Sequence, residues 1–282
     1  VPVYEAKMLH HYDHRWATYD AGAIRDVTDA EKNDPNFAVL PRYWVEVSEV
    51  TERLRGRWGK GWLLGWRDIA RATDERTMIA TAFPISGAGN KVPLVLSTRG
   101  NTWLAAAALD SLVQDFASRQ KVGGASLNYF LVKQFPVLPP GVFQHAPAPW
   151  DKEAFLDKWI AARVIEITYT AWDMKAFADD LQHSGSPFLW DSARRLLIRA
   201  ELDAAFFHLY GVPSIDVAYI LDTFHGLRSK DESRYGEYRT KRIVLEVFDA
   251  MQHAIDTREP YRTVVEPAPG HGQRHEMQEA AT

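Results

Sequence analysis

Residues 58–83, WGKGWLLGWRDIARATDERTMIATAF, decide how the rest of the chain is organised. Apolar side chains recur at alternate positions from Trp62, with Trp62, Leu64 and Trp66 on one side, which is typical of a strand. A second run, from Thr77 to Phe83, is rich in strand-forming residues. The polar segment from Arg71 to Arg76 joins the two runs. The sequence therefore predicts an antiparallel strand pair with a charged connection.

This predicted connection carries side chains that suit the edges of DNA bases. Guanidinium groups match guanine, carboxylates accept hydrogen bonds from cytosine, and hydroxyls pair with several bases. A solvated hairpin loop accounts for the same residue types. Taken alone, the stretch favours the solvated loop, so the choice depends on the rest of the chain.

Length and composition place the chain among ordinary globular proteins. Its 282 residues suffice for one large domain or two smaller ones, and 46% of them are hydrophobic and 25% charged. The chain has no cysteine, which excludes disulfides and thiolate zinc sites. No apolar run approaches the roughly 20 residues that span a bilayer, so we expect no membrane partner. Because the chain begins at Val1 instead of methionine, we expect it to be part of a longer protein.

The net charge of −4 is unevenly distributed. Residues 1–150 contain 17 lysines and arginines against 15 acidic residues (+2), whereas residues 151–282 contain 16 against 22 (−6). The overall sign argues against a nucleic-acid-binding protein. However, local basic patches set the electrostatic footprint, and basic residues outnumber acidic ones between Thr51 and Arg76.

The periodicity along the chain predicts an α+β fold, in which a small mixed α/β domain precedes an α-helical C-terminal domain. Further strands are expected at 42–50, 92–96 and 128–137, and one helix at 101–120. Helices are also expected at 151–182, 191–211, 214–224 and 232–257. The expected domains are an N-terminal connecting segment (1–40), the α/β domain (41–138), a proline-rich linker (139–149), the helical domain (150–258) and a flexible tail (259–282).

Motifs of catalysis are missing from the sequence. There is no serine elbow, no P-loop, no zinc-protease helix and no Asn-Pro-Pro-Tyr motif. The glycines at 87 and 89 precede a predicted strand, where a nucleotide-binding loop requires a helix. His10, His11, Asp13 and His14 could contribute to a zinc site, but spacing places no third ligand, and a hydrogen-bonded cluster explains them better. We therefore predict no catalytic, cofactor-binding or metal site within this chain.

Several long phrases together resemble one protein family. They are YEAKMLHHYDHRWATY (4–19), WLLGWRDIARATDERTMIATAFP (62–84), FASRQKVGGASLNYFLVKQFPVLPP (116–140), ELDAAFFHLYGV (201–212), AYILDTF (218–224) and GEYRTKRIVLEVFDAM (236–251). In this order they resemble the C-terminal part of bacterial restriction–modification and phage-defence methylases of the Type IIG-like group. In those enzymes a methyltransferase domain is followed by a target-recognition domain and helices.

The resemblance implies a function for the whole enzyme and a narrower one for this chain. The parent would be an adenine-specific DNA methyltransferase that uses S-adenosylmethionine, with or without a fused endonuclease, in the cytoplasm. Because the chain lacks the cofactor and catalytic motifs, methylation belongs to the parent. The expected partners are double-stranded DNA and a methyltransferase domain, in the same or a separate chain.

On this interpretation, base recognition and backbone positioning are assigned to different residues. For base or near-base contacts we nominate Arg67, Arg71, Thr73, Asp74 and Arg76. For the phosphate backbone we nominate Lys121, Asn128 and Lys133, around Gly123 and Gly124. The alternative for each residue is an internal salt bridge, for example between Asp68 and Arg71. The alternative for the chain is a protein-interaction module that docks a methyltransferase core and reads no DNA; an independent hydrolase has little support.

Overall fold

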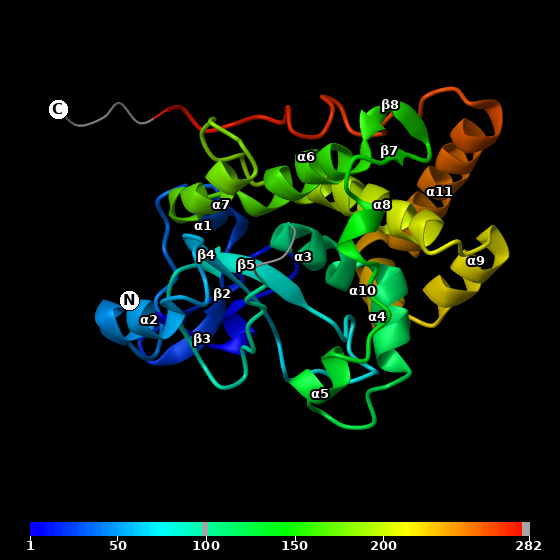
Figure 1. The fold of residues 1–282 in the computed structure, drawn as a ribbon. Coiled ribbons are helices and arrows are strands. Elements are labelled where there is room, and N and C mark those ends of the chain that lie inside the picture. The colour runs from blue at the N-terminus through cyan, green and yellow to red at the C-terminus, as the bar shows by residue number, and fades with distance from the viewer. Residues whose placement is uncertain (98–100, 278–282) are drawn as a thin grey trace.

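The predicted strand pair forms and lies at the centre of the N-terminal half of the chain. In the computed structural model, which describes residues 1–97 and 101–277, β4 (Trp62–Trp66) and β5 (Ala80–Pro84) pair antiparallel, with Leu64 opposite Ala82 (Figure 1). Every residue of β4 is buried, on both faces. The pair is therefore part of the core, and only the connection between its strands reaches the surface.

The remaining strands of the described residues are short and form three further pairs. β1 lies parallel to β6, whereas β2 pairs antiparallel with β3 and β7 with β8. Their bounds are β1 (Val3–Tyr4), β2 (Ala17–Asp20), β3 (Ala23–Asp26), β6 (Gly87–Ala88), β7 (Pro147–Ala148) and β8 (Asp151–Phe155).

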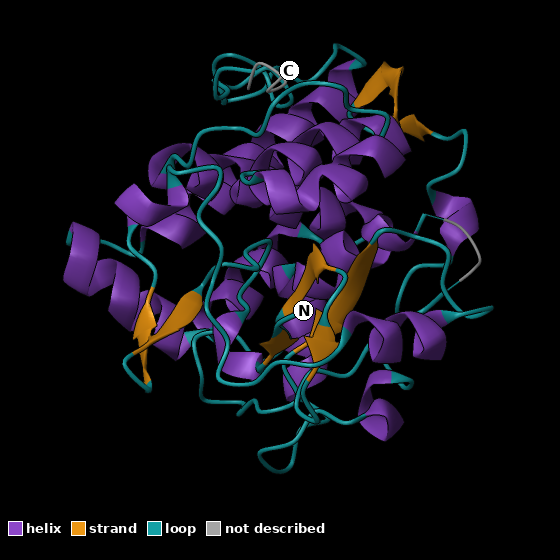
Figure 2. Ribbon diagram, turned by 90° about the vertical axis from the view of Figure 1, so that its left-hand side faces the viewer, coloured by secondary structure: helices purple, strands orange, loops and turns teal. Residues whose placement is uncertain are grey.

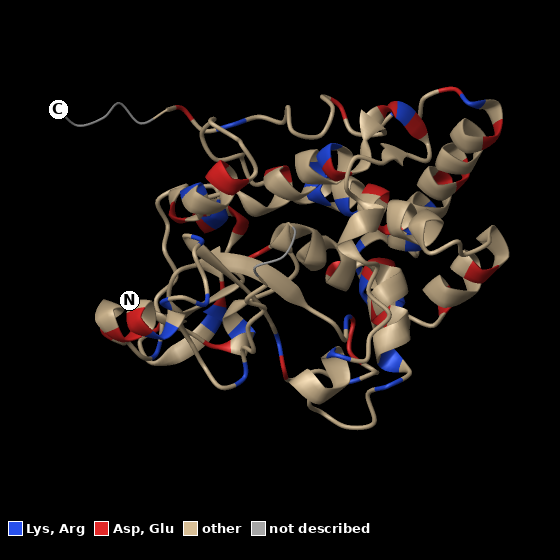
Figure 3. Cartoon of the chain, in the orientation of Figure 1, with Lys and Arg blue, Asp and Glu red and all other residues tan. Residues whose placement is uncertain are grey.

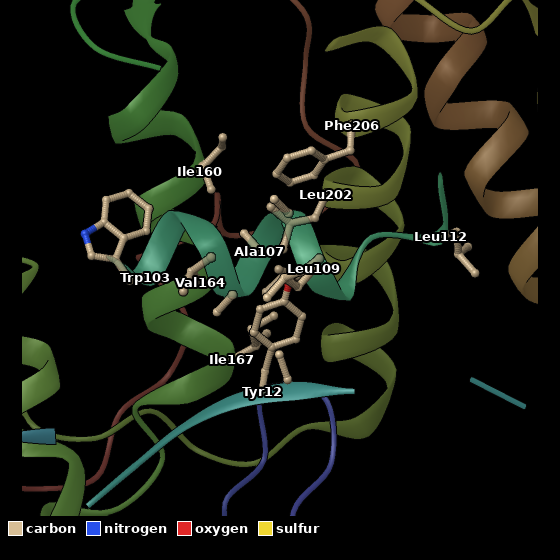
Figure 4. Packing of buried hydrophobic residues seen from close by; sticks show 14 of the residues in the cluster. Tyr12, Trp103, Ala107, Leu109, Leu112, Ile160, Val164, Ile167, Leu202 and Phe206 are labelled. Carbon is tan, nitrogen blue, oxygen red and sulfur yellow. The ribbon is translucent and has the colours of Figure 1, made fainter. Parts of the chain in front are cut away.

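One helix, α3 (Thr102–Asp110), joins the strand pair to the helical part. Eight of its nine residues are buried, as expected for a helix that is apolar on all sides. It packs on β5 and on α6 (Leu156–Thr168). Figure 4 shows it between α6 and α8 (Ser192–Leu209), with Tyr12 on the side of the strand. The buried cluster runs from Tyr4 to Val265, so the predicted linker at 139–149 does not separate two cores.

The C-terminal part is helical, which confirms the predicted α+β class (Figure 2). As the sequence predicts, α8 follows the N-cap Asp191, whose carboxylate accepts from the amides of Ala193 and Arg194. No helix in the described part of the chain is both long and apolar enough to cross a membrane. The other helices are α1 (Asp29–Lys32), α2 (Val47–Leu54), α4 (Leu112–Arg119), α5 (Tyr129–Val132), α7 (Lys175–Asp180), α9 (Ser214–Asp222), α10 (His225–Tyr235) and α11 (Arg239–Thr257).

Several predicted elements differ from the observed ones. The expected strand at 42–50 is replaced by α2, the one at 128–137 by α5, and 92–96 forms only a single bridge to β4. The helix expected at 101–120 breaks at Ser111, which has extended backbone and caps α4 through its side chain. The segment 151–182 divides into β8, α6 and α7. The helix expected at 232–257 divides into α10 and α11 at Gly236, where φ is +75°.

The expected flexible tail is wrong over residues 261–275, which pack against the helices. Tyr261 and Val265 are buried. Glu201 of α8 is fully buried, and its Oε1 accepts hydrogen bonds from Tyr261 Oη (2.8 Å) and the Val264 amide (3.0 Å). A buried carboxylate needs such donors, and the C-terminal segment provides them. Residues 278–282 of the predicted tail lie outside the described residues.

Candidate nucleic-acid interface

The connection between β4 and β5 is a tight turn fixed by its own hydrogen bonds. The Arg71 amide donates to Asp74 Oδ2 (3.0 Å), and the Asp74 amide donates to the Arg71 carbonyl (3.1 Å). Thr77 Oγ1 donates to the same carbonyl (3.0 Å). These bonds close the segment on itself, so residues 71–77 form a defined surface feature, which we call the recognition turn.

Arg119 of α4 holds the backbone of the recognition turn through its guanidinium group. Its Nη1 donates to the Ala72 carbonyl (2.9 Å), and its Nη2 donates to the carbonyls of Asp74 (2.8 Å) and Glu75 (2.9 Å). Its guanidinium also lies over the Phe224 ring, 4.2 Å from the centroid. One guanidinium therefore holds three carbonyls of the turn, using the fork geometry that lysine cannot provide.

Helix α10 braces the other end of the turn. Lys230 Nζ pairs with Glu75 Oε2 at 2.7 Å. Gly226 lies so close that a Cβ there would be 3.0 Å from the Glu75 amide nitrogen. The turn is thus positioned by the helical part of the chain as well as by the strands.

The prediction that Arg76 contacts DNA is wrong in this structure, because its side chain points into the protein. Only 11% of the side chain is exposed, and Nε pairs with Asp115 Oδ2 at 2.7 Å. The guanidinium also donates to the Asp110 carbonyl. Asp115 is fully buried and also accepts from Arg119 Nε (3.0 Å) and the Thr77 amide (3.0 Å). Arg76 is therefore a structural residue that anchors the segment leading into β5.

Asp74 links two of the nominated arginines, because it accepts from the Arg71 amide and its charge acts on Arg67. Arg67 is half-buried, and its Nε has no hydrogen-bond partner. Burial lowers the pKa of Arg67, and the nearby charge of Asp74 opposes this effect. Arg71, Thr73 and Asp74 are exposed.

The salt bridge considered between Asp68 and Arg71 does not form. Asp68 pairs instead with Lys91 Nζ at 2.7 Å. Neither Arg67 nor Arg71 has a carboxylate partner within ion-pair distance among the described residues. The exposed guanidinium of Arg71 thus keeps its donors available for a ligand, whereas the unpaired Nε of Arg67 is buried.

The backbone-positioning residues lie on a neighbouring segment that is tied to β4. The Leu127 amide donates to the Asp68 carbonyl (2.6 Å), and Trp66 Nε1 donates to the Leu127 carbonyl (2.7 Å). Lys121, Gly123, Gly124, Asn128 and Lys133 are all exposed, and a Cβ at either glycine would meet no atom within 4 Å. Asn128 also has a structural role, because its Oδ1 caps α5 at the Leu131 amide (3.2 Å).

A charge pattern that the sequence analysis missed marks this region. Residues 76–150 contain six basic residues (Arg76, Lys91, Arg99, Arg119, Lys121 and Lys133) and two acidic ones (Asp110 and Asp115), a net charge of +4. Both acidic residues are buried. Figure 3 shows basic positions gathered around α5 and the adjoining loops. A count restricted to this window would have found the pattern that the total charge of −4 conceals.

The histidines near the N-terminus take protein partners. His14 Nε2 lies 2.9 Å from Asp173 Oδ1, His11 Nε2 lies 3.0 Å from the Met78 carbonyl, and Asp13 pairs with Lys32 at 2.6 Å. The part of the chain that the structure describes contains no group of three His, Asp or Glu residues arranged to hold a metal ion.

A cavity of about 350 Å³ lies behind the recognition turn, lined by residues that include His10, Trp16, Glu75, Arg76 and Arg199. Acidic and basic side chains are present in equal numbers in its lining, so its charge selects no class of ligand.

A comparison with models of known protein families finds no match to this chain. Comparisons with curated proteins and with solved structures also find none.

Proposed function

We propose that this chain is the DNA-recognition module of a restriction–modification adenine methyltransferase and reads double-stranded DNA in the cytoplasm. The single observation that carries the proposal is the surface formed by residues 67–74 and 121–133. It presents Arg71, Lys121 and Lys133 as exposed cations without ion-pair partners among the described residues. The sequence resemblance supports the restriction–modification context. The methyl donor, S-adenosylmethionine, would bind to the methyltransferase domain and not to this chain.

The two parts of this surface would serve different purposes on the duplex. Lys121 and Lys133 would neutralise phosphates, which gives affinity and salt dependence without sequence preference. Arg71, Thr73 and Asp74 would meet base edges, where each good bidentate pair gives about 1–3 kcal/mol of discrimination. Such discrimination requires that these side chains extend from a rigid backbone. Arg119 holds the backbone of the turn through its hydrogen bonds to three carbonyls.

Selection from a randomised DNA pool tests the proposal and identifies the recognised sequence at the same time. Bound 30-bp duplexes are sequenced, and the selected duplex is titrated by fluorescence anisotropy at several salt concentrations. We expect an enriched sequence and an affinity that falls steeply with salt, with a slope of about −0.9 per phosphate contacted. Binding that is absent, or insensitive to salt, would contradict the proposal.

Substitutions separate the two roles of the surface. Arg71→Ala should relax the preference at one position of the selected site, whereas Lys121→Ala should weaken binding to all sequences alike and reduce the salt slope by about 1. Lys152→Ala is the matched control, because this lysine is exposed on β8, away from α5. Equal effects of Lys121→Ala and Lys152→Ala would place the DNA elsewhere.

A second candidate function is docking of a methyltransferase core without DNA reading. The observation that favours it is an exposed apolar group before and within α2, with exposed fractions of 57% for Leu40, 54% for Tyr43, 66% for Trp44 and 51% for Val47. Contiguous exposed apolar side chains are typical of protein interfaces. Co-purification with a methyltransferase domain, combined with no affinity for any duplex in the pool, would favour this candidate.

A further inference from the structure

We propose that Phe130 is a wedge that enters the base stack of the bound duplex, an inference that rests on the proposed function. Phe130 is 74% exposed, although the neighbouring aromatic residues of β4 are fully buried. It occupies the first turn of α5, in the segment that also carries Asn128 and Lys133. A single exposed apolar residue is ordinary. The inference therefore depends on how Phe130 is mounted and on what surrounds it.

The backbone that carries Phe130 is held in place by its neighbours in the sequence. Asn128 caps the turn, and the adjacent Tyr129 is fixed at both ends of its side chain. Its hydroxyl accepts from the Leu94 amide (2.9 Å) and donates to the Leu94 carbonyl (3.2 Å), and its ring meets the Trp66 ring edge to face at 5.0 Å. Trp66 belongs to the buried strand pair. Tyr129 thus ties α5 to the core, and its neighbour is held outwards.

The sequence on either side of Phe130 is basic, which favours a polyanion as its partner. Between Asp115 and Asp151 the sequence contains no acidic residue, and Lys121 and Lys133 are exposed on either side of the ring in the chain. Proteins that kink DNA insert apolar side chains such as phenylalanine between base pairs, while cations contact the flanking phosphates. An aromatic ring also stacks on any base, because every base offers a π-face. The combination of one ring with flanking cations matches this mode of binding.

An anionic membrane would also attract cations beside an aromatic residue, but the geometry favours DNA. Interfacial membrane binding uses a long amphipathic helix with a continuous apolar face. Helix α5 has four residues and presents one free ring, and the neighbouring recognition turn carries the exposed carboxylate of Asp74. A carboxylate there would be repelled by anionic lipids, whereas it can accept a hydrogen bond from cytosine.

A wedge makes a specific prediction about DNA substrates, because part of its binding free energy is spent on unstacking a base step. A site that is already unstacked removes this cost. The full chain should therefore bind a 30-bp duplex with a central single-nucleotide bulge about tenfold more tightly than the same duplex without the bulge, because the bulge already supplies one unstacked step. Phe130→Ala should abolish this difference, and Phe130→Trp should retain it.

The experiment measures both affinities by fluorescence anisotropy over a series of salt concentrations. Tyr219→Ala is the matched control, since this aromatic residue is 65% exposed on α9, well separated from α5 in Figure 1. We expect Phe130→Ala to lose the preference for the bulge with an unchanged salt slope, and Tyr219→Ala to behave like the unmodified chain. Circular dichroism verifies that both variants are folded.

The possible failures are distinguishable. If the chain binds DNA with a steep salt dependence but Phe130→Ala keeps the preference for the bulge, the wedge is wrong and the proposed function stands. If no duplex binds, both are wrong. Binding to vesicles of phosphatidylserine and phosphatidylcholine that depends on Phe130, without a preference for bulged DNA, would assign the ring to a membrane and overturn the wedge.

Discussion

Removing the charge of Asp115 should destabilise the fold, because this carboxylate holds two arginines beneath the recognition turn. Its side chain is fully buried and pairs with Arg76 at 2.7 Å and with Arg119 at 3.0 Å. The exposed fractions of these arginine side chains are 11% and 7%, so neither charge is well solvated. Breaking a buried ion pair from one side costs about 3–5 kcal/mol, since it leaves an uncompensated charge.

We expect Asp115→Asn to lower the free energy of unfolding by about 3–5 kcal/mol, at the upper end if both arginines lose their partner. Asparagine keeps the size of the side chain and an acceptor for the Thr77 amide, so the loss reports on charge rather than on a cavity. The measurement is urea unfolding monitored by tryptophan fluorescence, with the m-value unchanged.

A matched control uses an ion pair of the same chemistry in solvent. Glu232→Gln removes the carboxylate that pairs with Arg228 at 2.8 Å on the exposed face of α10. Exposed pairs contribute about 0–1 kcal/mol, so this variant should unfold almost like the unmodified chain. If Asp115→Asn costs no more than Glu232→Gln, the buried network is not what stabilises the turn, and the reasoning from burial is refuted.

Two further predictions concern the packing beneath the recognition turn. Burial raises the pKa of Asp203 to about 6; the folded state therefore binds the proton more tightly than the unfolded state, and stability should rise as the pH falls from about 6 towards 4. Asp203→Asn keeps an acceptor for the Leu112 amide. It should flatten this pH dependence and stabilise the chain at pH 7 by about 1–3 kcal/mol. The free energy of unfolding is measured in urea between pH 4 and 7, and a variant whose stability depends on pH as steeply as that of the unmodified chain would contradict the assignment. Gly226→Ala places a methyl group 3.0 Å from the backbone of Glu75, so we expect a loss of about 1–3 kcal/mol together with weaker base preference in the selection experiment. Gly211→Ala is no substitute control, because φ there is +67°, whereas Gly59→Ala meets no atom within 4 Å and should change neither property.

The central strand pair was predictable from sequence because its signal is local. Alternating tryptophans and leucines identify β4, and the polar connection identifies the turn. The orientation of the arginines was not predictable in the same way. Arg71 and Arg76 belong to the same polar segment of the sequence, yet Arg76 turns inward because Asp115, 39 residues further along, lies within the core. Only the tertiary arrangement supplies that partner.

The misassigned strand at 128–137 has a similar cause. NYFLVKQFPV is rich in strand-forming residues, which outweighed the capping asparagine and the proline at position 136. In the folded chain, Asn128 caps a short helix, and Tyr129 finds Trp66 and Leu94 as partners. A short segment follows its long-range contacts rather than its intrinsic preference. In this conformation Tyr129 contacts Trp66 of the core, and Phe130 is left 74% exposed.

The sequence suggested separate recognition and helical domains, but the helical part contributes contacts that shape the recognition turn. Three contacts that shape the recognition turn come from beyond residue 150: Phe224 stacks on Arg119, Lys230 pairs with Glu75, and Gly226 abuts the turn backbone. Residues 41–138 alone would lose all three and would expose the buried apolar surface of α3. A selective base contact requires the turn to hold one conformation. If the turn reads DNA as proposed, exchanging it between related proteins should preserve specificity only when the helices that contact it are exchanged as well.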